Sequence, residues 1–124
     1  MMMAEQGARV IKVEPMNVGD PMRYIGANKG GISSLFANCN RGKQSIRINL
    51  KDEDGQSLRR EMVPQGDVFI HNFRPGVMEK LNLGSESLRA LNPKLIYAAI
   101  SGFGKEGPLG GAPAYDPIIQ AQAG

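Results

Sequence analysis

Short apolar runs along the chain predict the strands of a sheet. Four segments have this pattern: Ala8–Glu14, Ser45–Leu50, Asp67–His71 and Leu95–Ser101. The last two are nearly continuous apolar runs, which is typical of parallel strands covered on both faces. Polar and apolar residues alternate in Ser45–Leu50, which predicts either an edge strand or a strand with one wet face.

Between these strands the apolar residues are spaced as in helices. Helices are predicted over Asp52–Val63, Pro75–Leu81 and Ser85–Leu91, and another begins within Tyr115–Gly124. Pro75 suits a first helical turn, and Ser85 suits a helix cap. Strands that alternate with helices predict an α/β fold with a parallel sheet.

Two glycine-rich segments, Pro15–Gly31 and Gly102–Pro113, fit neither pattern. Long loops in a compact domain are usually functional or disordered. In an open α/β sheet, ligands bind beyond the carboxyl ends of the strands. Three polar clusters fall at such positions: Glu14–Pro15, His71–Arg74 and Ser101–Gly104.

Composition narrows the possible functions. A chain of 124 residues makes one small domain or a piece of a larger one. The net charge of +3 comes from scattered Lys and Arg, which argues against a nucleic-acid-binding face. One histidine and one cysteine do not make a zinc site, and no apolar run approaches the roughly 20 residues of a membrane span. The single Cys39 suits a reducing, cytoplasmic compartment and is predicted to be a small buried residue.

The segment His71–Arg74 carries the strongest local chemistry. Free backbone N–H groups at the following helix would favour an anion, and Arg74 could bind a phosphate through two hydrogen bonds. Phe73 offers a flat face to a base or an acyl chain. A nucleotide-like ligand fits this set, but from these residues alone the favoured interpretation is structural, with Asn72 and Arg74 capping the helix and Phe73 filling the core. His71 lies in an apolar strand, which favours a packed or hydrogen-bonded imidazole over a general base.

Several motifs in this order resemble one enzyme family. The stretches "VIKVE", "NFRPG" and "ISGFG" occur together within Gly7–Gly124 at specific spacings. They resemble the class III CoA-transferases, the family of formyl-CoA transferase, carnitine CoA-transferase and α-methylacyl-CoA racemase. The resemblance implies a Rossmann-like parallel sheet with flanking helices, belonging to the large domain of an interlocked homodimer.

The resemblance also implies an activity, the transfer of CoA from an acyl-CoA to a free carboxylic acid. CoA is then a substrate and not a covalently bound cofactor, and no metal, nucleic acid or membrane is implied. The family's nucleophilic aspartate is expected beyond Gly124, and its first strand before Met1. Residues 1–124 are therefore expected to be a partial CoA-binding domain, inactive as a fragment.

The resemblance carries individual positions over to this chain. The expected CoA-binding residues are Ile48, Lys51, Asn72, Phe73, Arg74, Val77, Lys80 and Leu81. Of these, Lys51 and Lys80 are the candidates for the phosphates. Tyr115 and Asp116 match an aromatic–acid pair near the active site. In the racemases the position of Tyr115 is a catalytic histidine, and tyrosine is a poor base near neutral pH, which favours a transferase. An α-methylacyl-CoA racemase and a non-catalytic CoA- or nucleotide-binding fragment remain the alternatives.

Overall fold

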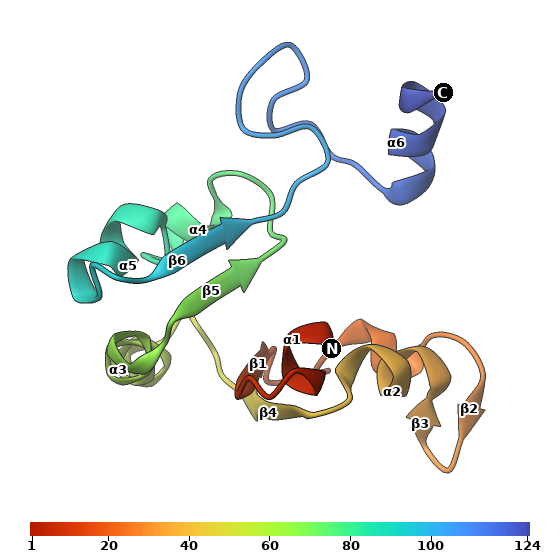
Figure 1. The fold of residues 1–124 in the computed structure, drawn as a ribbon, viewed down its shortest axis with the longest axis horizontal. Coiled ribbons are helices and arrows are strands. Elements are labelled where there is room, and N and C mark those ends of the chain that lie inside the picture. The colour runs from red at the N-terminus through yellow and green to blue at the C-terminus, as the bar shows by residue number, and fades with distance from the viewer. The chain divides into compact units, whose positions relative to one another are not determined.

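The computed structural model describes residues 1–124, except for the side chain of Arg59. The chain forms two compact units, Met1–Gly55 and Gln56–Gly124. Each unit contains a pair of parallel strands together with helices (Figure 1), so the fold class is α/β as predicted.

The first unit is built on strands β1 (Val10–Glu14) and β4 (Lys43–Arg47), which pair in parallel from Val10 opposite Lys43 to Glu14 opposite Arg47. The N–H of Ile48 extends this pairing by donating to the carbonyl of Glu14 at 3.1 Å. The remaining elements are α1 (Met2–Glu5), the 3-10 helix η1 (Pro21–Tyr24), the hairpin strands β2 (Asn28–Lys29) and β3 (Ile32–Ser33), and α2 (Ser34–Asn40).

The connection from β1 to α2 contains more regular structure than the sequence predicted. Asp20 caps η1 by accepting a hydrogen bond from the N–H of Met22 at 2.8 Å. Ser33 caps α2 by accepting from the N–H of Phe36 at 3.4 Å. These elements are held by caps and turns and are too short to show a hydrophobic period, so the sequence pattern could not reveal them.

The second unit is built on β5 (Val68–His71) and β6 (Ile96–Ala99), which are also parallel. The N–H of Ile100 prolongs the pairing by donating to the carbonyl of His71 at 2.9 Å. Before β5 come α3 (Glu53–Met62), which begins in the first unit, and the 3-10 helix η2 (Val63–Gln65). Between the strands lie α4 (Val77–Lys80) and α5 (Ser85–Leu91), and α6 (Asp116–Ala123) follows β6.

Two predicted helix starts are corrected by the backbone. Gly76 is the N-cap of α4 and has φ of 84°, a left-handed conformation that favours glycine, so Pro75 lies before the helix and not in its first turn. Gly84 is the N-cap of α5, so Ser85 is its first helical residue and not its cap.

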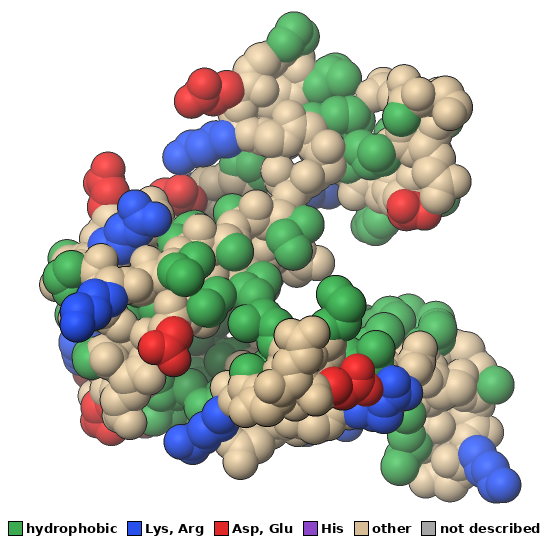
Figure 2. Space-filling model, viewed as in Figure 1, with side chains coloured by type: hydrophobic (Ala, Val, Ile, Leu, Met, Phe, Trp, Pro, Cys, Tyr) green, Lys and Arg blue, Asp and Glu red, His purple; other side chains and the backbone are tan. Residues whose placement is uncertain are grey.

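The core of the second unit lies on one side of the β5–β6 pair. Its buried apolar residues are Val63, Met78, Leu83, Leu88 and Leu95. Alternate residues of the strands face the other way, and Val68, Ile70 and Ile96 are 36%, 52% and 61% exposed. Figure 2 shows hydrophobic side chains open to solvent on the face in view. Within the described chain, the prediction that these strands are covered on both faces is therefore wrong.

Cys39 is also placed differently from the prediction, because it is exposed. The seven-residue helix α2 turns Phe36 and Asn40, one helical turn apart, toward partial burial. Cys39 lies on the other side of the helix, which faces solvent.

Among the described residues, no helix is long and apolar enough to cross a membrane.

Candidate functional site

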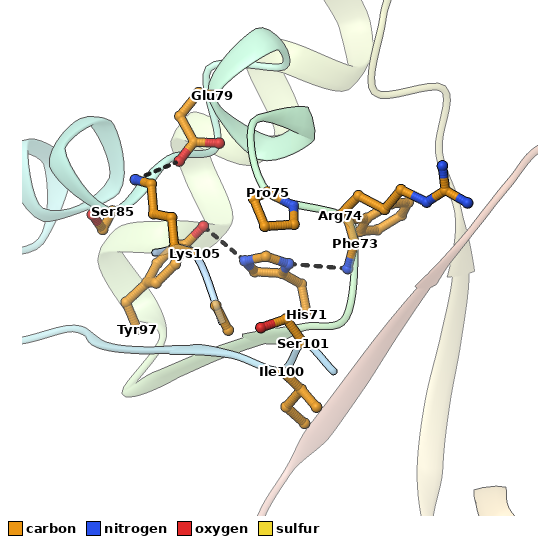
Figure 3. A pocket seen from close by; sticks show the side chains of 11 residues that line it. His71, Phe73, Arg74, Pro75, Glu79, Ser85, Tyr97, Ile100, Ser101 and Lys105 are labelled. Carbon is orange, nitrogen blue, oxygen red and sulfur yellow. Dashed lines mark hydrogen bonds and ion pairs between the residues drawn. The ribbon is translucent and has the colours of Figure 1, made fainter. Parts of the chain in front are cut away.

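A hollow of about 200 Å³ lies in the second unit, at the carboxyl ends of β5 and β6 (Figure 3). Because the two strands are parallel, both polar clusters that follow them meet at this edge. The lining residues are His71, Phe73, Arg74, Pro75, Glu79, Ser85, Tyr97, Ala99, Ile100, Ser101 and Lys105. The sequence-predicted clusters His71–Arg74 and Ser101–Gly104 therefore contribute to one site.

His71 is half-buried in this hollow, and both of its ring nitrogens have partners. The backbone N–H of Phe73 donates to Nδ1 at 3.2 Å, and Nε2 lies 2.9 Å from Oη of Tyr97. Burial lowers the pKa of His71, although the carboxylate of Glu79 raises it in part. The predicted hydrogen-bonded imidazole is thus confirmed.

Tyr97 joins His71 to the region between α4 and α5. Its hydroxyl lies 3.2 Å from the carbonyl of Leu83, which can only accept, so the tyrosine donates this hydrogen bond. Burial, and to a smaller extent the negative charge of Glu79, raises the pKa of Tyr97. Its ring stacks on Phe69 with centroids 5.4 Å apart.

Charged side chains of both signs face the hollow. Lys105 and Glu79 form an exposed ion pair with 3.7 Å between Nζ and Oε1. Hydrogen bonds from backbone N–H groups, chiefly its own, and the charge of Lys105 lower the pKa of Glu79. The guanidinium of Arg74 points away from His71 and Lys105 in Figure 3, so it is open to a ligand outside the hollow.

The side chain of Ser101 shapes the loop after β6. The hydroxyl of Ser101 accepts a hydrogen bond from the N–H of Gly104 at 3.1 Å. Gly104 has φ of 77°, where a residue with a side chain is strained. This turn places Lys105 at the hollow.

The other residues predicted on α4 and its ends lie outside this hollow. Asn72 and Lys80 are exposed, while Val77 and Leu81 are partly buried. The fully buried residue of the helix is Met78, which is 2% exposed. Only Phe73 and Arg74, of the predicted CoA-binding residues, line the hollow itself.

Two predicted CoA-binding residues belong to the first unit. Ile48 is buried, with 9% of its surface exposed, so its contribution to a ligand is limited to a small part of its side chain. Lys51 is exposed, and its backbone N–H donates to Oδ1 of Asn49 at 3.2 Å. Its ammonium group is not engaged in any ion pair within the described chain.

The predicted pair Tyr115–Asp116 stands at the start of α6. Tyr115 is 74% exposed and is the N-cap residue. Asp116 is the first helical residue, and its Oδ2 accepts a hydrogen bond from Nε2 of Gln120 at 2.6 Å. Neither residue lines the hollow.

The third polar cluster predicted at a strand end, Glu14–Pro15, lies outside this hollow and forms a buried charge centre whose partners the sequence did not predict. Glu14, at the carboxyl end of β1, is 1% exposed. Its carboxylate accepts two hydrogen bonds from Arg23, both at 2.9 Å, one from Ser45 at 2.8 Å and one from the N–H of Asp20 at 2.8 Å. These bonds, Arg23 first, lower the pKa of Glu14 to about 2 against the opposing effect of burial. A buried carboxylate at a strand end needs such donors, but their positions depend on the folded loop.

The hollow is smaller than the roughly 300–1,000 Å³ of a site that encloses a drug-sized ligand. It can therefore hold only part of a nucleotide-sized molecule. A flat aromatic face, two cations and several hydroxyls suit a ligand with an apolar portion and anionic groups. The edge of the sheet, and not an enclosed cavity, defines this site.

Comparison with known proteins gives clear relatives. The chain is 50% identical to an acetyl-CoA:oxalate CoA-transferase of Acetobacter aceti, over 98% of this chain and 31% of that protein. It is 43% identical to a succinyl-CoA–D-citramalate CoA-transferase of Chloroflexus aurantiacus, over 99% of this chain and 31% of that protein. The chain thus spans about a third of the length of these relatives.

Solved structures agree with this relationship. A crystal structure of Rv3272 from Mycobacterium tuberculosis matches with a TM-score of 0.89 and 39% identity, over 98% of this chain and 34% of that one. A CaiB/BaiF family protein from Brucella suis matches with a TM-score of 0.89 and 42% identity, over 97% of this chain and 33% of that one. The family model of CoA-transferase family III matches residues 1–124, and the chain therefore belongs to that family.

Proposed function

We propose that the whole protein containing these residues is an acyl-CoA:carboxylate CoA-transferase, which moves CoA from an acyl-CoA to a free carboxylic acid. The observation that carries this proposal is the family match over residues 1–124. The relatives named for acetyl-CoA:oxalate, succinyl-CoA–D-citramalate and succinate–glutarate transfer support it. Tyr115, in place of a histidine, further favours transfer over racemisation.

The CoA site that we propose uses the edge formed by the ends of β5 and β6. Phe73 offers a face to an apolar or aromatic part of CoA, and Asn72 offers an amide beside it. Arg74 and Lys80 supply cations for the phosphates, with Val77 and Leu81 as apolar neighbours. Ile48 and Lys51, in the first unit, are proposed as CoA-binding residues on the family resemblance alone. The whole protein is proposed to act as an interlocked homodimer.

The catalytic group that we propose is an aspartate beyond Gly124. A carboxylate nucleophile divides one difficult acyl exchange into easier steps through covalent intermediates. Tyr115 and Asp116, at the exposed start of α6, are proposed to lie near this reaction. CoA enters and leaves as a substrate.

The acceptors that we propose to test first are small dicarboxylates, because the relatives are named for oxalate, D-citramalate and glutarate. The whole protein should be incubated with acetyl-CoA or succinyl-CoA and each acid, and the products identified by mass spectrometry. Formation of the acceptor's CoA thioester, absent when the acid is omitted, is expected. Failure to form any new thioester across the panel would contradict the proposal, and epimerisation of a 2-methylacyl-CoA would indicate a racemase instead.

Lys80 gives a first test of the proposed CoA site. Lys80→Ala should raise KM for the acyl-CoA about fivefold, because an exposed ion pair contributes up to about 1 kcal/mol. Its kcat should change less, since the contact with a distant phosphate is the same in ground and transition states.

The matched control for this test is Lys94→Ala, which removes an exposed lysine just before β6, at the opposite end of the strand from the site. Steady-state kinetics with varied acyl-CoA would measure both variants. An unchanged KM in Lys80→Ala would remove Lys80 from the CoA site.

A further inference from the structure

The hydrogen bonds of His71 define its protonation state. A backbone N–H can only donate, so Nδ1, which faces the N–H of Phe73 at 3.2 Å, must be an unprotonated acceptor. In the neutral ring the proton then lies on Nε2, which donates to Oη of Tyr97 at 2.9 Å. Tyr97 in turn donates to the carbonyl of Leu83. The three bonds run in one direction, and every donor and acceptor is matched.

The bond to Phe73 also fixes a turn. An acceptor on one side chain that receives the N–H two residues later is the arrangement of an Asx turn, here made by an imidazole. This turn sets the direction in which Asn72 and Phe73 leave β5. The ring cannot swing away easily, because its edge packs against Tyr97 with centroids 5.3 Å apart (Figure 3).

We propose that His71 is a positioning residue for CoA binding, whose neutral imidazole, held by Tyr97, fixes the turn that presents Asn72 and Phe73 to the ligand. The inference rests on the proposed function, because it assumes that these two residues contact CoA. His71 itself needs no contact with CoA and takes part in no chemical step.

A consequence is a dependence of CoA affinity on pH. A second proton on the ring would have to sit on Nδ1, opposite the N–H of Phe73, so two donors would face each other and the turn would open. The other titratable or charged residues that line the hollow are Tyr97 from β6, Glu79 from α4, Lys105 from the loop after β6 and Arg74, whose guanidinium points away from His71.

Of these groups, His71 is the one whose charge changes in the mildly acidic range. Burial raises the pKa of Tyr97, so its hydroxyl stays protonated, and the lowered pKa of Glu79 keeps that carboxylate ionised. The pKa of His71 lies below 6.5 because of burial. CoA affinity should therefore be full near neutral pH and fall as the pH drops through the pKa of His71.

The experiment compares two variants of the whole protein. His71→Ala removes the acceptor, and His71→Asn keeps an acceptor oxygen near the position of Nδ1 but cannot take up a proton. Isothermal titration with coenzyme A would give Kd between about pH 7.5 and about pH 5. His71→Ala is expected to raise Kd about fivefold at neutral pH, as for the loss of one hydrogen bond. His71→Asn should bind nearly as the wild type there, with a Kd that does not rise on the acid side.

A spectroscopic readout tests the geometry without any ligand. In protein labelled with ¹⁵N-histidine, the ring signals that disappear in His71→Asn belong to His71. They should show a neutral ring with its proton on Nε2 near neutral pH. Tyr97→Phe should shift these signals while keeping the bond to Phe73.

The outcomes separate this inference from the proposed function. If the wild type and His71→Ala bind CoA with the same Kd, His71 has no positioning role, and the proposed function is unaffected. If the Kd of His71→Asn depends on pH as that of the wild type does, the positioning role is also overturned. This comparison holds even if His71→Ala fails to fold. A proton on Nδ1 of the neutral ring overturns the positioning role on structural grounds. A wild-type protein that does not bind CoA at any pH overturns the proposed function instead.

Discussion

Hydrogen bonds to Glu14 hold the segment after β1 in place. Its buried carboxylate receives hydrogen bonds from Arg23, Ser45 and the backbone of Asp20, so β1, β4 and the loop all meet at one charge. The guanidinium of Arg23 also lies over the ring of Phe36, 4.0 Å from its centroid, which adds α2 to the cluster. A single side chain thus holds the loop that the sequence left without regular structure.

The first prediction concerns the charge of this residue. Glu14→Gln keeps the shape but removes the negative charge, which leaves the partly buried Arg23 without its counter-ion. The free energy of unfolding of the whole protein should fall by about 3 kcal/mol, at the low end of the range for breaking a buried pair because Arg23 is partly solvated. Denaturant unfolding at neutral pH measures this change.

The carboxylate of Glu14 should also make the free energy of unfolding depend on pH. The matched control is Glu61→Gln, because Glu61 is exposed. The folded-state pKa of Glu14, about 2, lies below its ordinary value of 4.5. Its stabilisation is therefore complete above pH 4.5 and is lost as the pH falls toward 2. Glu14→Gln should lose less stability than wild type over that window. Parallel curves for the two proteins would contradict the role of the carboxylate.

At the scale of single residues, the sequence was informative where a motif was continuous. His71 ends an apolar strand, and the motif "HNFRPG" suggested either a helix cap or an anion site, of which the family resemblance favoured the second. Glu14 also ends a strand, but its partners Arg23 and Ser45 are remote from it in sequence, and no pattern joins them. A buried charge can be recognised from sequence only when its counter-charge lies at a regular spacing.

At the scale of elements, the apolar pattern predicted four strands and the longer helices, and α5 has the predicted bounds of Ser85–Leu91. The second predicted strand is shifted, because β4 covers Lys43–Arg47 and not Ser45–Leu50. The pattern missed α1, α2 and the β2–β3 hairpin. Gly30 and Gly31, with φ of 61° and 79°, make that hairpin turn. Such short elements bury too little apolar surface to leave a period in the sequence, so caps and glycine conformations determine them.

Gly102 determines how α6 meets the end of β6. A side-chain carbon on Gly102 would overlap Cβ of Ala114 and come within 2.9 Å of Cδ1 of Ile119. The absence of a side chain therefore allows α6, with Tyr115 and Asp116 at its start, to pack against the strand exit. The backbone conformation of Gly102 does not require glycine; the neighbouring atoms simply leave no room for a side chain.

The prediction at this scale is that Gly102→Ala displaces α6. If Tyr115 and Asp116 lie near the reaction as proposed, kcat for CoA transfer should fall about tenfold or more, because a displacement of about 1 Å at a reacting centre has that effect. KM for the acyl-CoA should change less. Steady-state kinetics of the whole protein measures both.

Gly66→Ala is the control for this substitution, since the nearest atom to a side-chain carbon there is 3.7 Å away and its φ of −93° suits any residue. This variant should keep wild-type kinetics. Equal kcat values for Gly102→Ala and Gly66→Ala would show that α6 does not depend on Gly102.

At the scale of the whole molecule, each unit leaves apolar strand residues uncovered. Ile70, Ile96 and Ile100 are 52%, 61% and 61% exposed in the second unit, and Ile11 and Val13 are 39% and 41% exposed in the first. Monomeric proteins rarely keep contiguous apolar surface of this kind in water.

We therefore predict that residues 1–124, expressed alone, bind a hydrophobic dye such as ANS and unfold without a sharp transition. The physical reason is that the exposed faces contribute no buried area to the stability of the isolated chain. Dye fluorescence and a calorimetric scan measure this, with the whole protein as the comparison. A cooperative calorimetric transition of the isolated chain, without dye binding, would contradict the prediction.

The pairing of β5 with β6 has a consequence for how the chain is made. Parallel strands need a long crossover, and here Val68 meets Ile96, a contact between segments about thirty residues apart. A ribosome adds residues in order, so β5 emerges from it before β6 does. Until Ile96–Ala99 has also left the ribosome, the apolar strand β5 has no partner at that edge and can pair with another nascent chain. The slow closure of such loops makes this strand prone to aggregation during synthesis.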